Sequence, residues 1–268
     1  MQYTLRKHDG LGNDFLVFDT AQGTPTRQWD VLAREWCDRT NGPGADGLLL
    51  LGGVGTTDLT MRLHNADGSI AEMSGNGIRC LVMAAHRATT NGVGTTYRVS
   101  TDAGPREATV IADDPDGTLH ISVDMGFVTD LPVPDRWESL GCNPDRPVRH
   151  VSVGNPHSVV WVGDVSEVDL KALGEMVPHV NLEIIEPGPE TNGVTMRVHE
   201  RGAGITLACG TGACAVADAA CAWGIVPRGS DEVIVHMDGG DARVRVSADR
   251  RATLIGPTNH RSDHTVTV

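Results

Sequence analysis

The chain has 268 residues, with 22 Lys and Arg against 35 Asp and Glu, which gives a formal net charge of −13 near neutral pH. Hydrophobic residues make up 40% and charged residues 21%, a composition that excludes a largely disordered protein. The length suits one large domain or two modest ones, each able to bury a core. The acidic balance argues against a nucleic-acid partner, because phosphate binding requires a patch of Lys and Arg.

The sequence contains no signal for a membrane, an export route or a metal. No apolar run approaches the roughly 20 residues that span a bilayer, and the charged N-terminus lacks the apolar segment of a signal peptide. The six cysteines are scattered, without a CxxC or HExxH pair, so neither a disulfide framework nor a metal site is expected. We therefore expect a cytoplasmic protein that binds no metal, with its oligomeric state left open and a homodimer among the options.

The chain repeats itself at about half its length. Residues 61–77, MRLHNADGSIAEMSGNG, align without a gap on residues 196–212, MRVHERGAGITLACGTG, at an offset of 135. A second match relates residues 11–19 to residues 153–164, in the same order along the chain. We therefore expect two pseudo-symmetric domains, residues 1–127 completed by a strand over 258–268, and residues 128–257.

Both halves contain the same series of expected elements. The first half has short strands of β-branched or alternating character at 15–18, 48–51 and 60–64, followed by a helix over 78–89. The second half has strands at 150–153, 159–162 and 195–199, followed by a helix over 213–223. Both helices are apolar nearly all round, as is typical of buried helices. The pattern predicts an α+β fold of two pseudo-symmetric domains, each a curved, mainly antiparallel sheet or barrel wrapped around a central helix.

Glycine-rich segments open both predicted helices. The sequences Gly-Asn-Gly at 75–77 and Gly-Thr-Gly at 210–212 leave backbone N–H groups uncovered at a helix N-terminus, which favours an anion. Two such starts facing each other could hold one carboxylate. Ser74 and Cys209 stand directly before them at matching positions of the repeat. Taken alone, Ser74 is better explained as an N-cap, whereas for Cys209 we favour a function, because a helix N-terminus lowers the pKa of a thiol.

Several motifs together resemble the diaminopimelate epimerase family, cofactor-independent amino-acid epimerases related to proline racemase. They are KHDGLGNDF, NADGS, GNGIRC, SVGNPH, the ERG of ERGAGIT, and ACGTGA, and the similarity covers nearly the whole chain. The resemblance implies inversion of an α-carbon, from LL-diaminopimelate to the meso form in lysine and cell-wall biosynthesis. It also implies two acid–base groups on opposite faces of the substrate, with neither a metal nor pyridoxal phosphate.

The resemblance also assigns site residues. Cys209, Ser74, His157 and Glu200 are implied as the catalytic or acid–base-tuning residues. The implied substrate-binding residues are Asn13, Asn65, Gly75, Asn76, Asn155, Asn181, Glu200, Arg201, Gly210 and Thr211. Without the resemblance, Asn13 and Asn155 are equally well explained as turn residues, whereas the position of Glu200 and Arg201 before Gly210 favours a site over a solvated ion pair.

This sequence departs from the family pattern at the first helix start. Ser74 stands where the family usually has Cys, and a serine hydroxyl is a far weaker acid than a thiol. Cys80 cannot replace it, because it lies six residues on, about 9 Å along the helix and inside the core. Asp9 and Ile205 also differ from the family's usual His and Glu. A lyase of the hydroxyproline dehydratase type, in which Ser replaces one Cys, and a racemase or binder for another amino acid therefore stay open as alternatives.

Overall fold

The computed structural model describes residues 1–227 and 229–268, and these residues form two compact units. Residues 1–123 and 256–268 make the first unit, and residues 124–255 make the second. The sequence interpretation places the same divisions at 127/128 and 257/258. The chain passes from one unit to the other within strand β8 (Leu119–Phe127) and returns within strand β17 (Arg251–Thr267). Strand β17 therefore contributes its first residues to the sheet of the second unit and the remainder to the sheet of the first.

A closed sheet forms the wall of the first unit. Its strands pair in the order β17-β1-β2-β3-β4-β6-β7-β8, and the pairing of β8 with β17 closes the barrel. The β2–β3 and β4–β6 pairs are parallel, whereas β17–β1, β1–β2, β3–β4, β6–β7 and β7–β8 are antiparallel. Strand β5 adds to the edge of β4. The bounds are β1 (Gln2–Gly10), β2 (Asn13–Asp19), β3 (Gly47–Gly52), β4 (Asp58–Asn65), β5 (Ile70–Ala71), β6 (Thr96–Thr101) and β7 (Gly104–Asp113).

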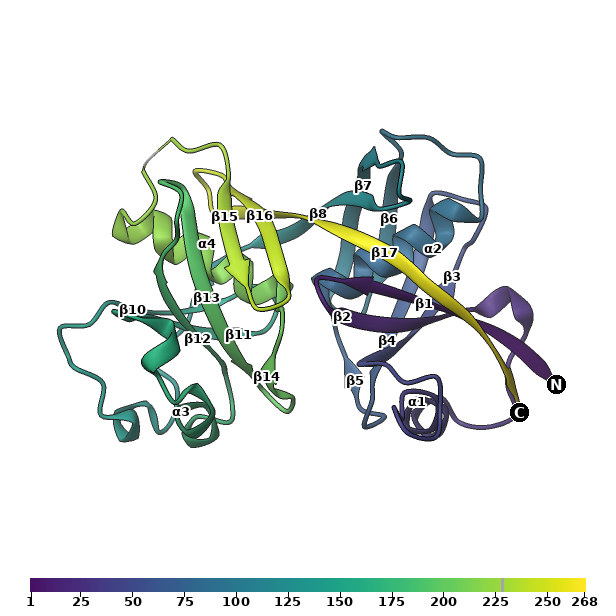
Figure 1. Ribbon diagram of the computed structural model, residues 1–268, viewed down its shortest axis with the longest axis horizontal. Coiled ribbons are helices and arrows are strands. Elements are labelled where there is room, and N and C mark those ends of the chain that lie inside the picture. Colours follow the sequence, from purple (N-terminus) through teal and green to yellow (C-terminus); the bar gives the residue numbers. More distant parts are fainter. Residues whose placement is uncertain (228) are drawn as a thin grey trace. The chain divides into compact units, whose positions relative to one another are not determined.

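Helix α2 (Gly75–Arg87) fills the interior of this barrel, as Figure 1 shows. It packs against β1, β2, β3, β4 and β7, and all its residues except Arg87 are buried. Helix α1 (Trp29–Trp36) covers the outside of the sheet, where Leu32 and Trp36 share a core cluster with Leu48 and Leu50 of β3. Because helices cover both of its faces, β3 is buried along its whole length.

The second unit repeats this architecture. Its strands pair in the order β9-β10-β11-β12-β13-β15-β16-β17, with parallel pairs at β11–β12 and β13–β15. The Val128 N–H donates to the Arg250 carbonyl at 2.8 Å and joins the two ends of this sheet, while β14 adds to β13. The bounds are β9 (Thr129–Asp130), β10 (Val148–Ser152), β11 (Pro156–Trp161), β12 (Asn181–Pro187), β13 (Gly193–Glu200), β14 (Gly204–Thr206), β15 (Val233–Met237) and β16 (Gly240–Val246).

Helix α4 (Gly210–Trp223) is the central helix of the second unit. It packs against strands β10 to β13, β15 and β16, and its residues from Gly210 to Ala220 are buried. Helix α3 (Leu170–Met176) lies on the outside, where Leu170 shares a cluster with Val160 and Leu182. The predicted α+β fold, with two sheets each wrapped around a central helix, is confirmed.

The helices differ from the sequence prediction in number and in where they begin. The sequence predicts one helix in each half, whereas α1 and α3 are additional, and their eight and seven residues are too few to show a clear 3.6-residue period. Both central helices begin three residues earlier than predicted, because Ser74 and Cys209 cap them and the glycines form the first turn. The described residues also form three short 3₁₀ helices, η1 (Thr20–Gln22), η2 (Trp137–Leu140) and η3 (Val165–Glu167).

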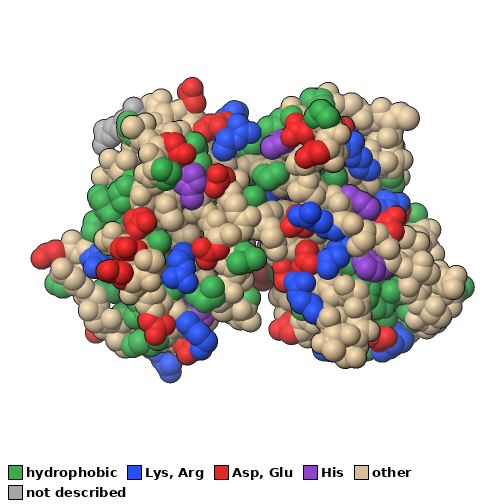
Figure 2. All heavy atoms as spheres, viewed as in Figure 1, with side chains coloured by type: hydrophobic (Ala, Val, Ile, Leu, Met, Phe, Trp, Pro, Cys, Tyr) green, Lys and Arg blue, Asp and Glu red, His purple; other side chains and the backbone are tan. Residues whose placement is uncertain are grey.

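Acidic and basic side chains are interspersed on the molecular face shown in Figure 2. Neither sign forms one continuous area on that face. Within residues 1–227 and 229–268, no helix combines the length and the apolar character that crossing a bilayer requires.

Candidate active site

Cys209 lies at the start of α4 with its sulfur between a carboxylate and a hydroxyl. Its side chain is 4% exposed, and Sγ accepts a hydrogen bond from the Gly212 N–H at 3.4 Å, which caps the helix. The thiol donates to Glu200 Oε2 at 3.2 Å, and Thr211 Oγ1 lies 3.5 Å from the sulfur. Glu200 Oε1 accepts from the Thr206 hydroxyl at 2.5 Å, which fixes the carboxylate. The thiol proton therefore points at a base that is held in place.

The pKa of the Cys209 thiol lies well above its ordinary value. Burial is the main cause, followed by the negative charges of Glu200 and Glu183, while the contacts with Thr211 and the Gly212 N–H act in the opposite direction. The Gly212 N–H at the helix start lowers this pKa as expected, but the expectation that the thiolate is favoured overall is wrong. Burial and two carboxylates outweigh the helix N-terminus. The resting form is the thiol, and Glu200 is the acceptor placed to take its proton.

His157 reaches Cys209 through other side chains. Its ring is fully buried on β11, where Nδ1 lies 2.6 Å from Glu183 Oε1 and Nε2 lies 2.9 Å from Asn155 Oδ1. Asn155 Nδ2 in turn donates to Thr211 Oγ1 at 3.3 Å. Glu183 is absent from the residues predicted from the sequence. A signal was present, since Glu183 is an acidic residue inside the otherwise apolar run LEII of β12.

Asn181 joins two strand ends beside this cluster. Its Oδ1 accepts from the Arg201 backbone N–H at 2.8 Å, and its Nδ2 donates to the Pro156 carbonyl at 3.1 Å. Asn181 is buried, whereas Arg201 is exposed at the end of β13. Asn181 therefore shapes the backbone around Arg201 in this structure.

The start of α2 in the first unit combines polar side chains with the buried guanidinium of Arg79, which donates to Asn76 Oδ1 at 2.9 Å. Ser74 is half-buried, and its hydroxyl accepts from the Gly77 N–H at 3.0 Å. Asn76 Nδ2 donates to Asn13 Oδ1 at 3.3 Å, and Asn13 Nδ2 donates to Asp46 Oδ2 at 2.8 Å. Asn65 lies at the end of β4, where its Nδ2 donates to Ser69 Oγ at 3.0 Å and shapes the turn into β5.

Two half-sites result. We define the first half-site as Asn13, Asn65, Ser74, Gly75 and Asn76. We define the second half-site as Asn155, His157, Asn181, Glu183, Glu200, Arg201, Cys209, Gly210 and Thr211. Hydrogen bonds connect Asn13 to Asn76 in the first half-site, and Glu183 to Cys209 in the second. Gly75 and Gly210 are the first residues of their helices, where backbone N–H groups have no partner within the helix.

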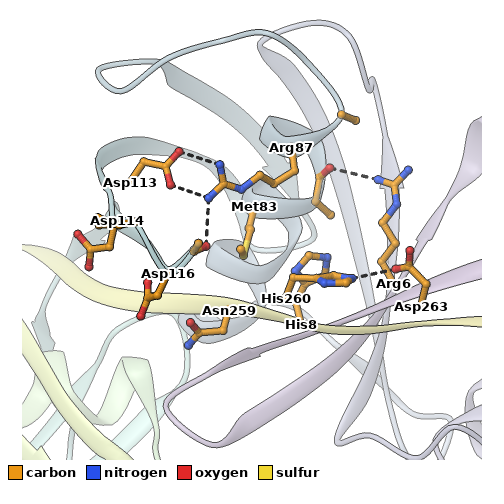
Figure 3. A pocket seen from close by; sticks show the side chains of 14 residues that line it. Arg6, His8, Met83, Arg87, Asp113, Asp114, Asp116, Asn259, His260 and Asp263 are labelled. Atoms are coloured by element: carbon orange, nitrogen blue, oxygen red, sulfur yellow. Dashed lines mark hydrogen bonds and ion pairs between the residues drawn. The ribbon is translucent and has the colours of Figure 1, made fainter.

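A separate cavity of about 740 Å³ lies in the first unit (Figure 3). It is lined by the C-terminal end of α2, by the segment at 113–117 and by parts of β1 and β17. Arg87 there donates to both carboxylate oxygens of Asp113, at 2.7 and 2.6 Å. This end of α2 lies about 20 Å along the helix from Ser74, given 13 residues at about 1.5 Å each. The cavity is therefore distinct from the first half-site.

Comparisons with known proteins show which family the sequence matches and which solved structures share the fold. The sequence matches the profile of the family described as "Diaminopimelate epimerase" over residues 5–130 and 149–260. It is 39% identical to the diaminopimelate epimerase of Thermosynechococcus vestitus, over 91% of this chain and 92% of that protein. Among solved structures, a predicted epimerase of Pseudomonas aeruginosa aligns with a TM-score of 0.78 at 15% identity, over 99% of each chain. A hydroxyproline epimerase of Agrobacterium vitis aligns with a TM-score of 0.67 at 16% identity, over 99% of this chain and 91% of that one. The two structural similarities show a shared fold.

Proposed function

Because the chain belongs to the diaminopimelate epimerase family, we propose that it inverts one α-carbon of LL-diaminopimelate and so forms the meso isomer. The observation that carries this proposal is the Cys209 thiol, which stands at a glycine-rich helix start and is hydrogen-bonded to Glu200. The product serves lysine and cell-wall biosynthesis, and the reaction is proposed to take place in the cytoplasm.

The second half-site supplies the base in this proposal. An amino-acid α-C–H is a very weak acid, so the negative charge that develops on its removal must be stabilised. Glu200 takes the thiol proton, and the resulting thiolate of Cys209 removes the α-proton. Backbone N–H groups at Gly210 and Thr211 bind the substrate carboxylate, where the helix N-terminus favours negative charge.

The first half-site supplies the proton for the opposite face. Ser74 stands at the start of α2, and its hydroxyl returns a proton to the carbanion-like intermediate. Gly75 and Asn76 contribute further N–H groups to the carboxylate, while Asn13, Asn65, Asn155, Asn181 and Arg201 bind the remaining polar groups of the substrate. All acid–base groups and charge-stabilising donors of this mechanism belong to the chain, so it calls for neither a metal nor pyridoxal phosphate.

One experiment in D₂O tests the proposal. The protein is incubated with LL-diaminopimelate, with trans-3-hydroxyproline and with a panel of other amino acids, and the products are analysed by NMR and mass spectrometry. We expect α-deuterium and meso product from LL-diaminopimelate, and neither from the Cys209→Ala variant. Dehydration of trans-3-hydroxyproline would instead support the lyase, for which Ser74 is the motivating residue. Exchange confined to another amino acid, or binding without exchange, would contradict the proposed substrate or activity.

A further inference from the structure

An unbroken series of side-chain contacts runs from the buried carboxyl of Glu183 to the Cys209 sulfur. The steps are Glu183 to His157 at 2.6 Å, His157 to Asn155 at 2.9 Å, Asn155 to Thr211 at 3.3 Å, and Thr211 to Cys209 at 3.5 Å. All of these residues belong to the second unit. Glu183 and His157 are both fully buried, so solvent cannot take over either end of their contact.

The partners of this series determine where its hydrogens lie. Asn155 Nδ2 donates to Thr211, so the atom that Asn155 turns toward His157 Nε2 is its carbonyl oxygen. A carbonyl oxygen only accepts, and Nε2 therefore carries a hydrogen. The other ring nitrogen shares one hydrogen with Glu183 Oε1, either as imidazolium with carboxylate or as imidazole with carboxylic acid. Both arrangements leave the pair with no net charge, as its burial requires.

The carboxyl of Glu183 fits against the first turn of α4 because residue 212 is glycine. A Cβ atom at Gly212 would lie 2.9 Å from Glu183 Oε1 and 3.3 Å from Cys209 Sγ. The second carboxyl oxygen, Oε2, is buried without a hydrogen-bond partner. Burial also raises the pKa of this carboxyl, which is consistent with an uncharged pair. A buried polar atom left unpaired is costly, so the contact with His157 must offset that cost.

We propose that Glu183 is a positioning residue that acts on Cys209 through this directed series of hydrogen bonds. It keeps a hydrogen on His157 Nε2, which holds Asn155 with its amide N–H toward Thr211. The Thr211 oxygen then accepts, so its own hydrogen remains available to donate to the Cys209 sulfur. Donation from Thr211 stabilises the thiolate, while Glu200 accepts the proton that the thiol loses.

This inference rests on the proposed function of Cys209 as the base, but its test does not require a substrate. The ionisable side chains to which the pKa of Cys209 responds are Glu200 on β13 and Glu183 on β12, and Glu183 is paired with His157 on β11. The test variants must therefore remove the ionisable carboxyl of Glu183 equally and leave Glu200 and His157 in place. Glu183→Gln and Glu183→Leu meet this condition. Only Gln can donate to His157 Nδ1 and so keep the hydrogen on Nε2.

The measurement is the pH titration of thiolate ultraviolet absorbance in the full chain. Each variant is compared with the same variant carrying Cys209→Ser, so that the difference reports Cys209 alone. We expect the pKa of Cys209 to be higher in Glu183→Leu than in Glu183→Gln by about one unit, the effect of losing one hydrogen bond to a charged group. Adding Thr211→Val to both variants should remove the difference, since it deletes the last donor of the series.

Equal pKa values in the Gln and Leu variants would overturn the proposal, and so would a difference that persists with Thr211→Val. If Glu183→Leu does not fold, as judged by circular dichroism, Glu183→Ala replaces it with the same expected sign. The pH profile of α-proton exchange on LL-diaminopimelate should shift in parallel with the absorbance titration. Absence of exchange in the unmodified protein would refute the proposed function, while the absorbance result would still decide the role of Glu183.

Discussion

The starts of α2 and α4 share one backbone arrangement and differ in the side chains behind it. In each, the capping side chain accepts from the N–H three residues on, at 3.0 Å for Ser74 and 3.4 Å for Cys209. In each, an asparagine at the start of another strand contacts the second residue of the helix. Asn13 of β2 contacts Asn76, and Asn155, directly before β11, contacts Thr211, both at 3.3 Å. The repeat has therefore kept the geometry that presents backbone N–H groups.

The strand registers show what has changed. In the parallel pair β2–β3, Leu49 stands two residues beyond the partner of Phe15, and in the parallel pair β11–β12, Glu183 stands two residues beyond the partner of His157. A Cβ atom at Gly77 would meet Leu49 Cδ2 at 3.5 Å, just as one at Gly212 would meet Glu183. Phe15 and Leu49 thus occupy in the first unit the places of His157 and Glu183 in the second.

The two half-sites also differ at the residue that ends the long strand of the repeat, Asn65 in β4 and Glu200 in β13. Asn65 aligns with Glu200 in the repeat, so an amide in the first half-site replaces the carboxylate that accepts the Cys209 thiol. The second half-site has a buried thiol, a carboxylate that accepts its hydrogen bond and a buried ionisable pair behind them. The first half-site has a hydroxyl and amides, with apolar packing at Leu49 and the buried Arg79 guanidinium behind them. The comparison teaches that one fold can present two similar glycine-rich helix starts and place a thiol bonded to a carboxylate at one of them and a hydroxyl at the other.

The largest expected effect comes from removing the base of the second half-site. Cys209→Ala should lower α-proton exchange by roughly 10³-fold or more, because general acid–base groups contribute about 10²–10⁴ in rate. Exchange is measured in D₂O by NMR, and circular dichroism checks that the fold is intact. Cys221→Ala, farther along α4, is the matched control and should keep full activity. A Cys209→Ala variant that still exchanges would show that the two half-sites do not differ in the way described.

The second largest effect should come from making the first half-site resemble the second. A thiol is a stronger acid than a serine hydroxyl by several pKa units, each worth about 1.4 kcal/mol. Ser74→Cys should therefore raise epimerisation by about 10²-fold, while deuterium washout by Cys209 on its own face changes little. Ser74→Ala serves as the control and should lower epimerisation. Unchanged or slower epimerisation by Ser74→Cys would favour the lyase or another substrate.

Replacing Glu200 with Gln should have smaller effects, which are opposite in sign for two rates, the alkylation of Cys209 and the exchange of the α-proton. Its carboxylate raises the pKa of Cys209, so Glu200→Gln should lower that pKa and speed alkylation of Cys209 at a fixed pH. Exchange should nevertheless fall by about tenfold, because the amide accepts the thiol hydrogen bond but cannot take the proton. Peptide mass spectrometry measures the alkylation. Parallel changes in both rates would indicate that Glu200 acts only through the Cys209 pKa.

The smallest expected effect is a pH-dependent change in the free energy of unfolding, caused by the buried His8 of the first unit. His8 is 1% exposed, neither of its ring nitrogens has a hydrogen-bond partner, and its pKa is lowered from 6.5 to about 3, mainly by burial. Between about pH 3 and 6.5 the unfolded chain therefore binds more protons, so the free energy of unfolding should fall as the pH falls through this range. The decline approaches about 1.4 kcal/mol per pH unit, and His8→Leu should remove it.

Urea unfolding at one pH above 6.5 and one between about 3 and 6.5 measures this decline in both proteins. Exchange activity above pH 6.5 should be the same in both, since His8 lines the cavity at the far end of α2 and not the first half-site. Equal loss of stability in the two proteins would show that His8 is not the responsible group. Loss of activity in His8→Leu would show that this end of α2 affects the half-site.

Much of the architecture follows from local patterns in the sequence. The repeat predicts two similar units, and the all-apolar helices following the glycine-rich segments predict central helices, because both signals lie within short continuous stretches. Cys80 was expected in the core on its spacing alone, and it is fully buried. Apart from Glu183, the candidate residues of each half-site were predicted from motifs, and the structure shows which of them touch.

Tertiary structure alone decided the acid–base properties. Cys209 and Glu183 are 26 residues apart, and Glu183 is 26 residues from His157, so only the pairing of β11 with β12 beneath α4 brings the three together. The sequence-based argument counted the helix N-terminus, which is local, and gave the wrong direction for the Cys209 pKa. Burial and the carboxylates of Glu200 and Glu183 are decided by packing across strands, and at these short distances in a low-dielectric interior they outweigh the helix end.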